Sequence, residues 1–231
     1  MADLKEPDYL GHRERLRKRF LFNEGRDMPD YELLELLLTI AIPRRDVKPL
    51  AKELVRRFKD FAGVISARTE ELMQVPGVKE NTVVVLKSIK SAAVRLSWQS
   101  LCNSDAPVFS NWDELIDYCH AAMAHNDVEE FRTIYLNAKL QVIGEDVHQR
   151  GTIDKVAIHP REVIKQAMFK NARGMVLVHN HPSGDIRPSK ADVDITKNII
   201  EAARLVNIEV FDHLIIGKSE VFSFRDAGLI K

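Results

Sequence analysis

An apolar run that ends in two histidines is the feature that most constrains the fold of this chain. Met175 to Val178 is too apolar for a half-exposed strand, so it predicts a strand inside a sheet, with His179 and His181 at its carboxyl end. Residues two apart in a strand project to the same side, so the two imidazoles can converge on one ion. Pro182 then ends the ladder and Gly184 permits a sharp turn, which returns the next helix toward the histidines.

Asp192, at the start of that helix, completes a candidate set of metal ligands with the two histidines. Imidazole nitrogens and carboxylate oxygens are ligands that zinc takes, and three protein ligands leave a fourth position for water. Water in that position ionises near neutral pH and can attack a carbonyl group, which distinguishes a catalytic zinc site from a structural one. His179, His181 and Asp192 therefore predict a catalytic metal site.

The same stretch also fits a helix cap without any metal. Ser189 precedes the helix and Asp192 is its third residue, as in a capping box. A carboxylate on a metal has little capacity left for a backbone amide. The metal interpretation therefore predicts that Ser189 caps the helix while Asp192 turns toward the histidines.

Three further polar residues are weaker candidates for this site. His159 precedes Pro160 at a predicted helix start, which favours a local cap or a packing role over a fourth ligand. Asp212 and His213 are neighbours in an apolar strand and so face opposite sides of it. One of the two could orient a metal-binding imidazole from behind.

Composition restricts the class of protein. The chain has 231 residues, 45% of them hydrophobic, and its 34 basic and 34 acidic residues cancel, which argues against a dedicated polyanion-binding protein. Residues 1–100 nevertheless hold 19 Lys and Arg against 15 Asp and Glu, a net charge of +4. Two cysteines are too few for a disulfide framework, and neither a signal peptide nor a membrane span is evident. We expect a cytoplasmic protein.

The hydrophobic pattern changes along the chain and predicts two domains. Residues 1–100 repeat apolar residues at helical spacing, and turn-forming residues gather between Gln99 and Pro107. Residues 107–231 then alternate predicted helices with strand-like runs. The helices are expected at 111–124, 161–169 and 189–206, and the strands at 131–136, 140–147, 151–158, 175–178, 208–216 and 221–224.

The metal motif resembles a known family. The string from His179 to Asp185, followed by Pro188, Ser189 and Asp192, is similar to the JAMM signature of MPN-domain metalloproteases, in the form found in the bacterial RadC family. The resemblance covers nearly the whole chain, including Gly11 to Arg13, Gly151 to Ile153, His159 to Val163, Asp212 to Gly217 and the region of Ser223 and Phe224. It implies an α+β chain: an all-helical N-terminal domain, then an MPN (JAMM, cytidine-deaminase-like) mixed sheet flanked by helices.

The resemblance also implies an activity and residue roles. His179, His181 and Asp192 would bind zinc, Ser189 would help to hold the water or the oxyanion, and an earlier glutamate would act as general base. Glu129 and Glu130 compete for that last role. Glu130 is favoured because it directly precedes the hydrophobic Phe131, and Glu145 is the alternate. The substrate would be a peptide or an isopeptide-linked protein.

The N-terminal helices suggest a second hypothesis. Leu72 to Val78 resembles the hairpin of a helix-hairpin-helix DNA-binding motif, although Lys79 stands where a second glycine is expected. Basic residues surround this hairpin, and a solvated helix surface would explain them equally well: Arg13, Arg15, Arg17, Lys18, Arg19, Arg44, Arg45, Lys48, Lys52, Arg56 and Arg57. DNA is thus a possible partner, with the C-terminal domain as a scaffold. A zinc deaminase is excluded because the Pro-Cys-x-x-Cys ligand pair is missing.

Overall fold

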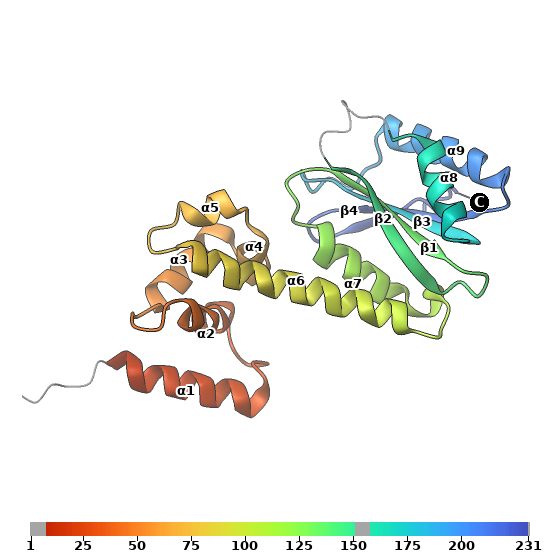
Figure 1. The fold of residues 1–231 in the computed structure, drawn as a ribbon. Coiled ribbons are helices and arrows are strands. Elements are labelled where there is room, and N and C mark those ends of the chain that lie inside the picture. The colour runs from red at the N-terminus through yellow and green to blue at the C-terminus, as the bar shows by residue number, and fades with distance from the viewer. Residues whose placement is uncertain (1–7, 151–157, 231) are drawn as a thin grey trace, which may run out of the picture. The chain divides into compact units, whose positions relative to one another are not determined.

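The computed structural model describes residues 8–150 and 158–230 (Figure 1), and the chain divides into two compact units, residues up to Ala92 and residues from Ala93 onward. The first unit is helical, as predicted. Its elements are α1 (Asp8–Asn23), α2 (Asp30–Ala41), α3 (Lys48–Phe58), α4 (Phe61–Ser66), α5 (Thr69–Met73) and the first half of α6 (Glu80–Asn103). Their apolar faces form one core that includes Leu34, Leu54 and Leu86, each fully buried.

Helix α6 extends further than the sequence predicts. It continues to Asn103, through much of the 99–107 segment where turn-forming residues placed the domain boundary, and the division between the units falls within it. The reason is tertiary: Val94, Trp98 and Leu101 join the core of the second unit. Burial of these side chains outweighs the weak helix propensity of the polar residues between them.

The second unit is a mixed five-stranded sheet with helices on both faces. Its elements are the 3-10 turn η1 (Val108–Asn111), α7 (Trp112–Met123), β1 (Glu130–Leu136), β2 (Val142–Arg150), α8 (Pro160–Phe169), β3 (Gly174–Asn180), α9 (Lys190–Arg204), β4 (Glu209–Ile216) and β5 (Val221–Ser223). The strand order is β2-β1-β3-β4-β5, and only the β3–β4 pair is parallel among the described strands. The strand expected at 151–158 lies outside the described residues except for Ile158, as does Gly151 to Ile153.

The alternation of side chains in the strands builds two separate cores. Ile134 of β1 and Val176 of β3 face α7, whereas Phe131 and Leu177, an odd number of positions away, face α8 and α9. Figure 1 shows α7 on one side of the sheet and α8 and α9 on the other. A residue's position in this alternation therefore decides which side of the sheet its functional group can reach.

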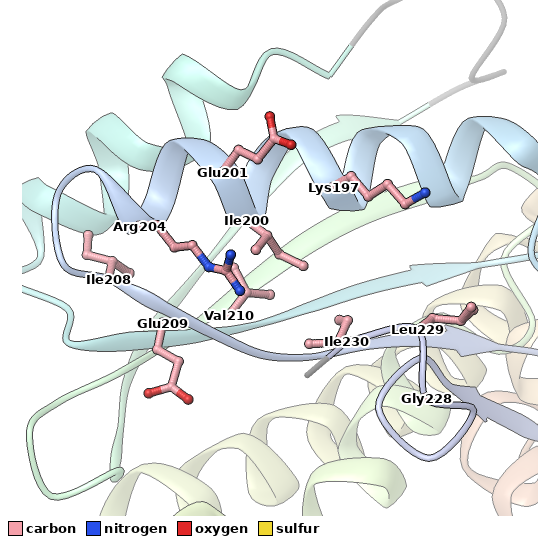
Figure 2. A pocket seen from close by; sticks show the side chains of 10 residues that line it. All are labelled: Lys197, Ile200, Glu201, Arg204, Ile208, Glu209, Val210, Gly228, Leu229 and Ile230. Carbon is pink, nitrogen blue, oxygen red and sulfur yellow. The ribbon is translucent and has the colours of Figure 1, made fainter.

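A cavity of about 440 Å³ lies between α9, β4 and the C-terminal residues (Figure 2). Its floor is apolar, and its charged lining residues are Lys197, Glu201, Arg204 and Glu209. None of the predicted site residues lines it. None of the helices in the described ranges is long and apolar enough to cross a membrane.

Candidate metal centre

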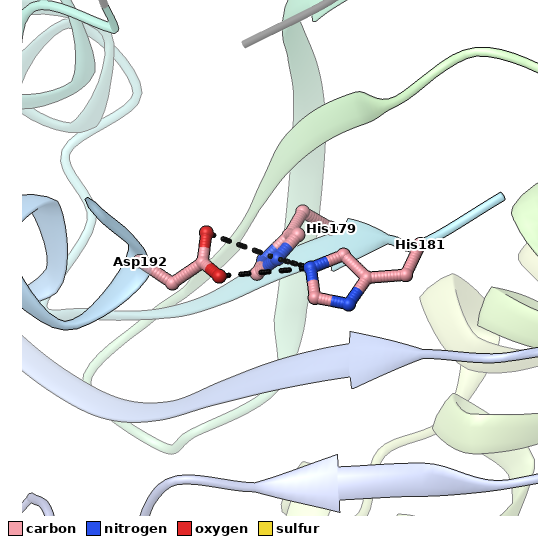
Figure 3. Close-up of side chains that lie close together, drawn as sticks. All are labelled: His179, His181 and Asp192. Carbon is pink, nitrogen blue, oxygen red and sulfur yellow. Dashed lines mark hydrogen bonds and ion pairs between the residues drawn. The ribbon is translucent and has the colours of Figure 1, made fainter. Parts of the chain in front are cut away.

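Strand β3 carries the first histidine to a buried position, as its apolar sequence predicts. All seven residues of β3 are buried, and His179 is 1% exposed near its carboxyl end. His181 follows just beyond the strand and is partly exposed, while Asp192 lies in the first turn of α9 and is buried. Figure 3 shows the three side chains pointing toward one another, and one ligand atom from each lies within 4.8 Å of the others.

The spacing of these atoms fits a small tetrahedral cation. The Nε2 atoms of His179 and His181 are 3.0 Å apart, and the His179 Nε2 lies 3.3 Å from Oδ1 of Asp192. The His181 Nε2 lies 3.6 Å from Oδ2 of Asp192. In a tetrahedral zinc site with metal–ligand distances of about 2.0–2.1 Å, neighbouring ligand atoms are roughly 3.3 Å apart. Each of the three distances is within a few tenths of an ångström of that spacing, with Asp192 presenting a different oxygen to each histidine.

A chain of hydrogen bonds fixes the tautomer of His179. The Thr196 hydroxyl donates to the Asp192 carbonyl at 2.5 Å, so its oxygen accepts from Nδ1 of His213 at 2.6 Å. The other nitrogen of His213 lies 2.7 Å from Nδ1 of His179. Burial lowers the pKa of His213 well below its ordinary value, so this ring is neutral and its Nε2 accepts. His179 therefore donates from Nδ1 and presents the bare Nε2 to the metal position.

His181 is oriented in the same sense by its own loop. Its Nδ1 lies 2.5 Å from the carbonyl oxygen of Asp185, which can only accept, so Nδ1 carries the proton. Gly184, with φ of +86°, takes the left-handed conformation that lets the loop fold back, as its sequence position predicts. Both histidines consequently direct an Nε2 lone pair toward the same point as Asp192.

Asp192 makes both sets of contacts that the sequence set against each other, the capping box and the approach to His179. Its backbone amide donates to the Ser189 hydroxyl at 3.2 Å, and its Oδ2 accepts from the Ser189 amide at 2.7 Å. Its Oδ1 remains directed at His179. Both hold because a carboxylate has two oxygens with two lone pairs each.

The ionisation of Asp192 and His181 is coupled. Burial acts to raise the pKa of Asp192, but its contacts with His179, His181 and Ser189 hold it well below the usual range. The hydrogen bond with Asp192 raises the pKa of His181 against the effect of its burial. Two nitrogen lone pairs at 3.0 Å repel each other, and a cation between them removes that repulsion.

The structure does not bring Glu130 to this centre, contrary to the sequence-based choice of base. Phe131 is the cross-strand partner of His179 and faces α8 and α9 with it, so its neighbour Glu130 faces the opposite side of the sheet. There Glu130 is 1% exposed and accepts from the Arg132 guanidinium. The hydrophobic residue after Glu130 did not identify the base, because the alternation of side chains along β1 decides which face of the sheet Glu130 occupies.

The alternate, Glu145, belongs to the same network as Glu130. Arg132 donates to it at 3.0 Å, and the Tyr118 hydroxyl donates to it at 2.6 Å. Its cross-strand partner, Ile134, faces α7. Glu145 therefore stabilises the buried arginine on the face away from the triad.

Glu129 is the glutamate that reaches the centre. It lines a cavity of about 580 Å³ together with His181, Ser189 and Asp192. Its charge also contributes to the raised pKa of His181, after larger effects from Asp192, burial and Asp185. It directly precedes Glu130, the first residue of β1.

Known proteins place this arrangement in a family. Residues 109–229 match the family described as RadC-like JAB domain. The chain belongs to the RadC family. A UPF0758 protein of Ruegeria pomeroyi is 46% identical to it over 225 residues, which are 97% of this chain and 100% of that protein. A UPF0758 protein of Rhodobacter capsulatus is 46% identical over 215 residues, 93% of this chain and 100% of that protein.

RadC membership and the mixed sheet confirm the family and the fold class that the sequence predicts. Of the weaker site candidates, His213 contacts His179, whereas Asp212 binds Ser223 and the backbone amides of His213 and Arg225. His159 is exposed and makes no capping hydrogen bond from its side chain. The role of Thr196 could not be predicted from the sequence, because a threonine on an amphipathic helix belongs to no functional motif.

Proposed function

We propose that this RadC-family chain is a zinc-dependent hydrolase that cleaves a peptide or isopeptide bond. The observation that carries the proposal is the convergence of His179, His181 and Asp192, whose ligand atoms lie within 4.8 Å of one another. The cavity of about 580 Å³ beside them leaves room for a substrate carbonyl. A closed structural site would instead use a fourth protein ligand.

The residues around the triad divide the chemistry. When bound, zinc would supply a Lewis acid and a water that ionises near neutral pH. The Glu129 carboxylate would accept a proton from the attacking water and would return it to the leaving amine. The Ser189 oxygen accepts from the Asp192 amide, and its hydroxyl hydrogen would donate to the developing oxyanion. His213 and Thr196 keep His179 in the binding tautomer.

Zinc content tests this proposal first. The purified full chain is expected to hold about one zinc per chain by elemental analysis, and His179→Ala and Asp192→Asn are expected to lose it. His159→Ala and Asp194→Asn are matched controls, because both residues are exposed and lie outside the triad. A parent protein without zinc, or a His179→Ala protein that keeps it, would refute the site.

Activity is the second test. Glu129→Gln is expected to retain zinc and to lose most cleavage of a fluorogenic isopeptide-linked substrate, whereas Glu130→Gln should retain both. If Glu130→Gln instead abolishes cleavage while the fold and the zinc remain intact, Glu130 is the base after all.

The first unit supports a second candidate function, binding of a nucleic-acid backbone. A hollow of about 450 Å³ is bordered by Arg44, Arg45, Lys79 and by Gly77, whose φ is +96°. These three cations are exposed, whereas Arg13 is buried and donates to the carbonyls of Ile42, Pro43 and Arg45. Arg13 thus supports the loop that presents the two arginines rather than contacting a phosphate.

Salt dependence tests this second candidate. The full chain is expected to bind duplex DNA with an affinity that falls as salt rises, because phosphate contacts release counterions. The double substitution Arg44→Gln and Arg45→Gln should weaken binding and flatten the salt slope by about 2. Arg161→Gln with Lys165→Gln removes equal charge from α8 and serves as the control. If both variants lose DNA affinity equally, the effect comes from the change in net charge and not from a binding site at Arg44 and Arg45.

A further inference from the structure

Asn180, the residue between the two histidines, joins the metal-binding strand to the segment that carries Glu129. It is fully buried, and its side chain spans both ends of that segment. Its Oδ1 accepts from the Glu130 amide at 2.9 Å. Its Nδ2 donates to the carbonyl oxygens of Val128 at 3.2 Å and Asn126 at 3.4 Å.

These bonds lie at the beginning of β1, just before its ladder with β3. The ladder between β1 and β3 begins at the pair Phe131 and His179. Asn180 is adjacent to His179 and projects to the opposite face, toward the connection from α7 to β1. Its primary amide offers an acceptor and two donors, which suits a segment that presents one amide and two carbonyls.

The contacts bracket Glu129 on both sides. The Asn180 side chain holds the carbonyl of Val128, immediately before Glu129, and the amide of Glu130, immediately after it. With both flanking peptide groups fixed to β3, the direction of the Glu129 side chain is set by the strand that carries His179 and His181. Base and metal ligands therefore keep one geometry, which catalysis requires to within fractions of an ångström.

We propose that Asn180 is a positioning residue that fixes Glu129 at the metal centre. The inference rests on the proposed hydrolase function, in which Glu129 is the base. It assigns no ligand role to Asn180, whose amide is committed to the 126–130 segment. Loss of the amide should leave the triad intact and displace the base alone.

A metal-bound probe can test this without a known substrate. In the full chain loaded with Co²⁺, acetohydroxamic acid binds the ion as its anion, and a neighbouring carboxylate accepts the proton that it loses. We expect Asn180→Ala and Glu129→Gln each to weaken its affinity roughly 10-fold, measured by the visible Co²⁺ spectrum. In the double variant, no further weakening is expected, because both substitutions remove the same interaction between Glu129 and the bound hydroxamate. Asn198→Ala, at an exposed position of α9, is the control.

Amide hydrogen exchange gives an independent reading of the same contact. Asn180→Ala should speed exchange of the Glu130 amide and leave the amides of β3 protected. If Asn180→Ala does not fold, Asn180→Ser replaces it, since the hydroxyl keeps a polar group there but cannot span the segment. Unchanged hydroxamate affinity in the single variant, or full additivity in the double variant, would overturn the proposal. Should the parent bind no Co²⁺, the hydrolase proposal fails, and Glu130 exchange alone decides whether Asn180 holds the segment.

Discussion

Replacing His213 should weaken zinc binding although His213 touches no metal. In His213→Leu, the Nδ1 proton of His179 loses its acceptor at 2.7 Å, and the Thr196 hydroxyl loses the donor at 2.6 Å. A buried group left without its partner costs about 1–3 kcal/mol. His179 can avoid this cost only by leaving the tautomer that presents Nε2 to the ion. Zinc affinity should therefore fall by roughly 10- to 100-fold, equivalent to about 1.4–2.7 kcal/mol.

The measurement is competition with a chromophoric zinc chelator at constant pH, together with a thermal melt of the metal-free protein. His213→Gln is the matched variant, because its side-chain oxygen can accept from His179 and its amide can donate to Thr196. It should retain most of the affinity that His213→Leu loses. If folded His213→Leu binds zinc as tightly as the parent, the hydrogen-bond chain does not set the tautomer of His179, and this reasoning fails.

Three further predictions follow from the same structure. In the metal-free protein, the contact with Asp192 raises the pKa of His181. The stabilisation from this pair is therefore complete below about pH 6.5 and is lost as pH rises through the folded-state pKa. The urea midpoint should fall over that pH range in the parent but not in His181→Asn. Arg132→Met should destabilise the fold by about 3–5 kcal/mol in urea unfolding, because it removes the positive charge that pairs with the buried Glu130, and should leave zinc content unchanged. A variant as stable as the parent would show that the pair is dispensable. Gly174→Ala should cost about 1–3 kcal/mol in thermal unfolding, because its methyl carbon would lie 2.1 Å from the Phe211 ring, and an unchanged melting temperature would mean that the ring moves aside freely.

Local sequence was sufficient to predict those features that depend on a single helix, strand or turn. The apolar run before His179 identified a buried strand, and the Pro and Gly that follow marked the turn that returns Asp192. Periodicity likewise placed α7, α8 and α9 to within a few residues. These features depend on contacts between residues close together in the chain, which a sequence pattern records directly.

The choice between adjacent glutamates was decided only in three dimensions. Glu129 and Glu130 have the same chemistry, but the alternation of β1 directs Glu130 toward Arg132, whereas Glu129, just before the strand, lines the cavity. The phase of that alternation is fixed by the pairing of Phe131 with His179, across a separation that no local pattern spans. The helical extension of α6 to Asn103 has the same origin, because Trp98 and Leu101 are held by a core assembled from later strands.

The sequence by itself thus determined which side chains could bind a metal, because ligand chemistry belongs to the residue. Tertiary structure decided which of them face each other and in which protonation state. The neutral His213 behind His179 and the Asn180 amide beside Glu129 acquire their roles from partners 34 and about 50 residues away, as the hydrogen bonds record. Such roles depend on burial and direction, and both are properties of the folded chain.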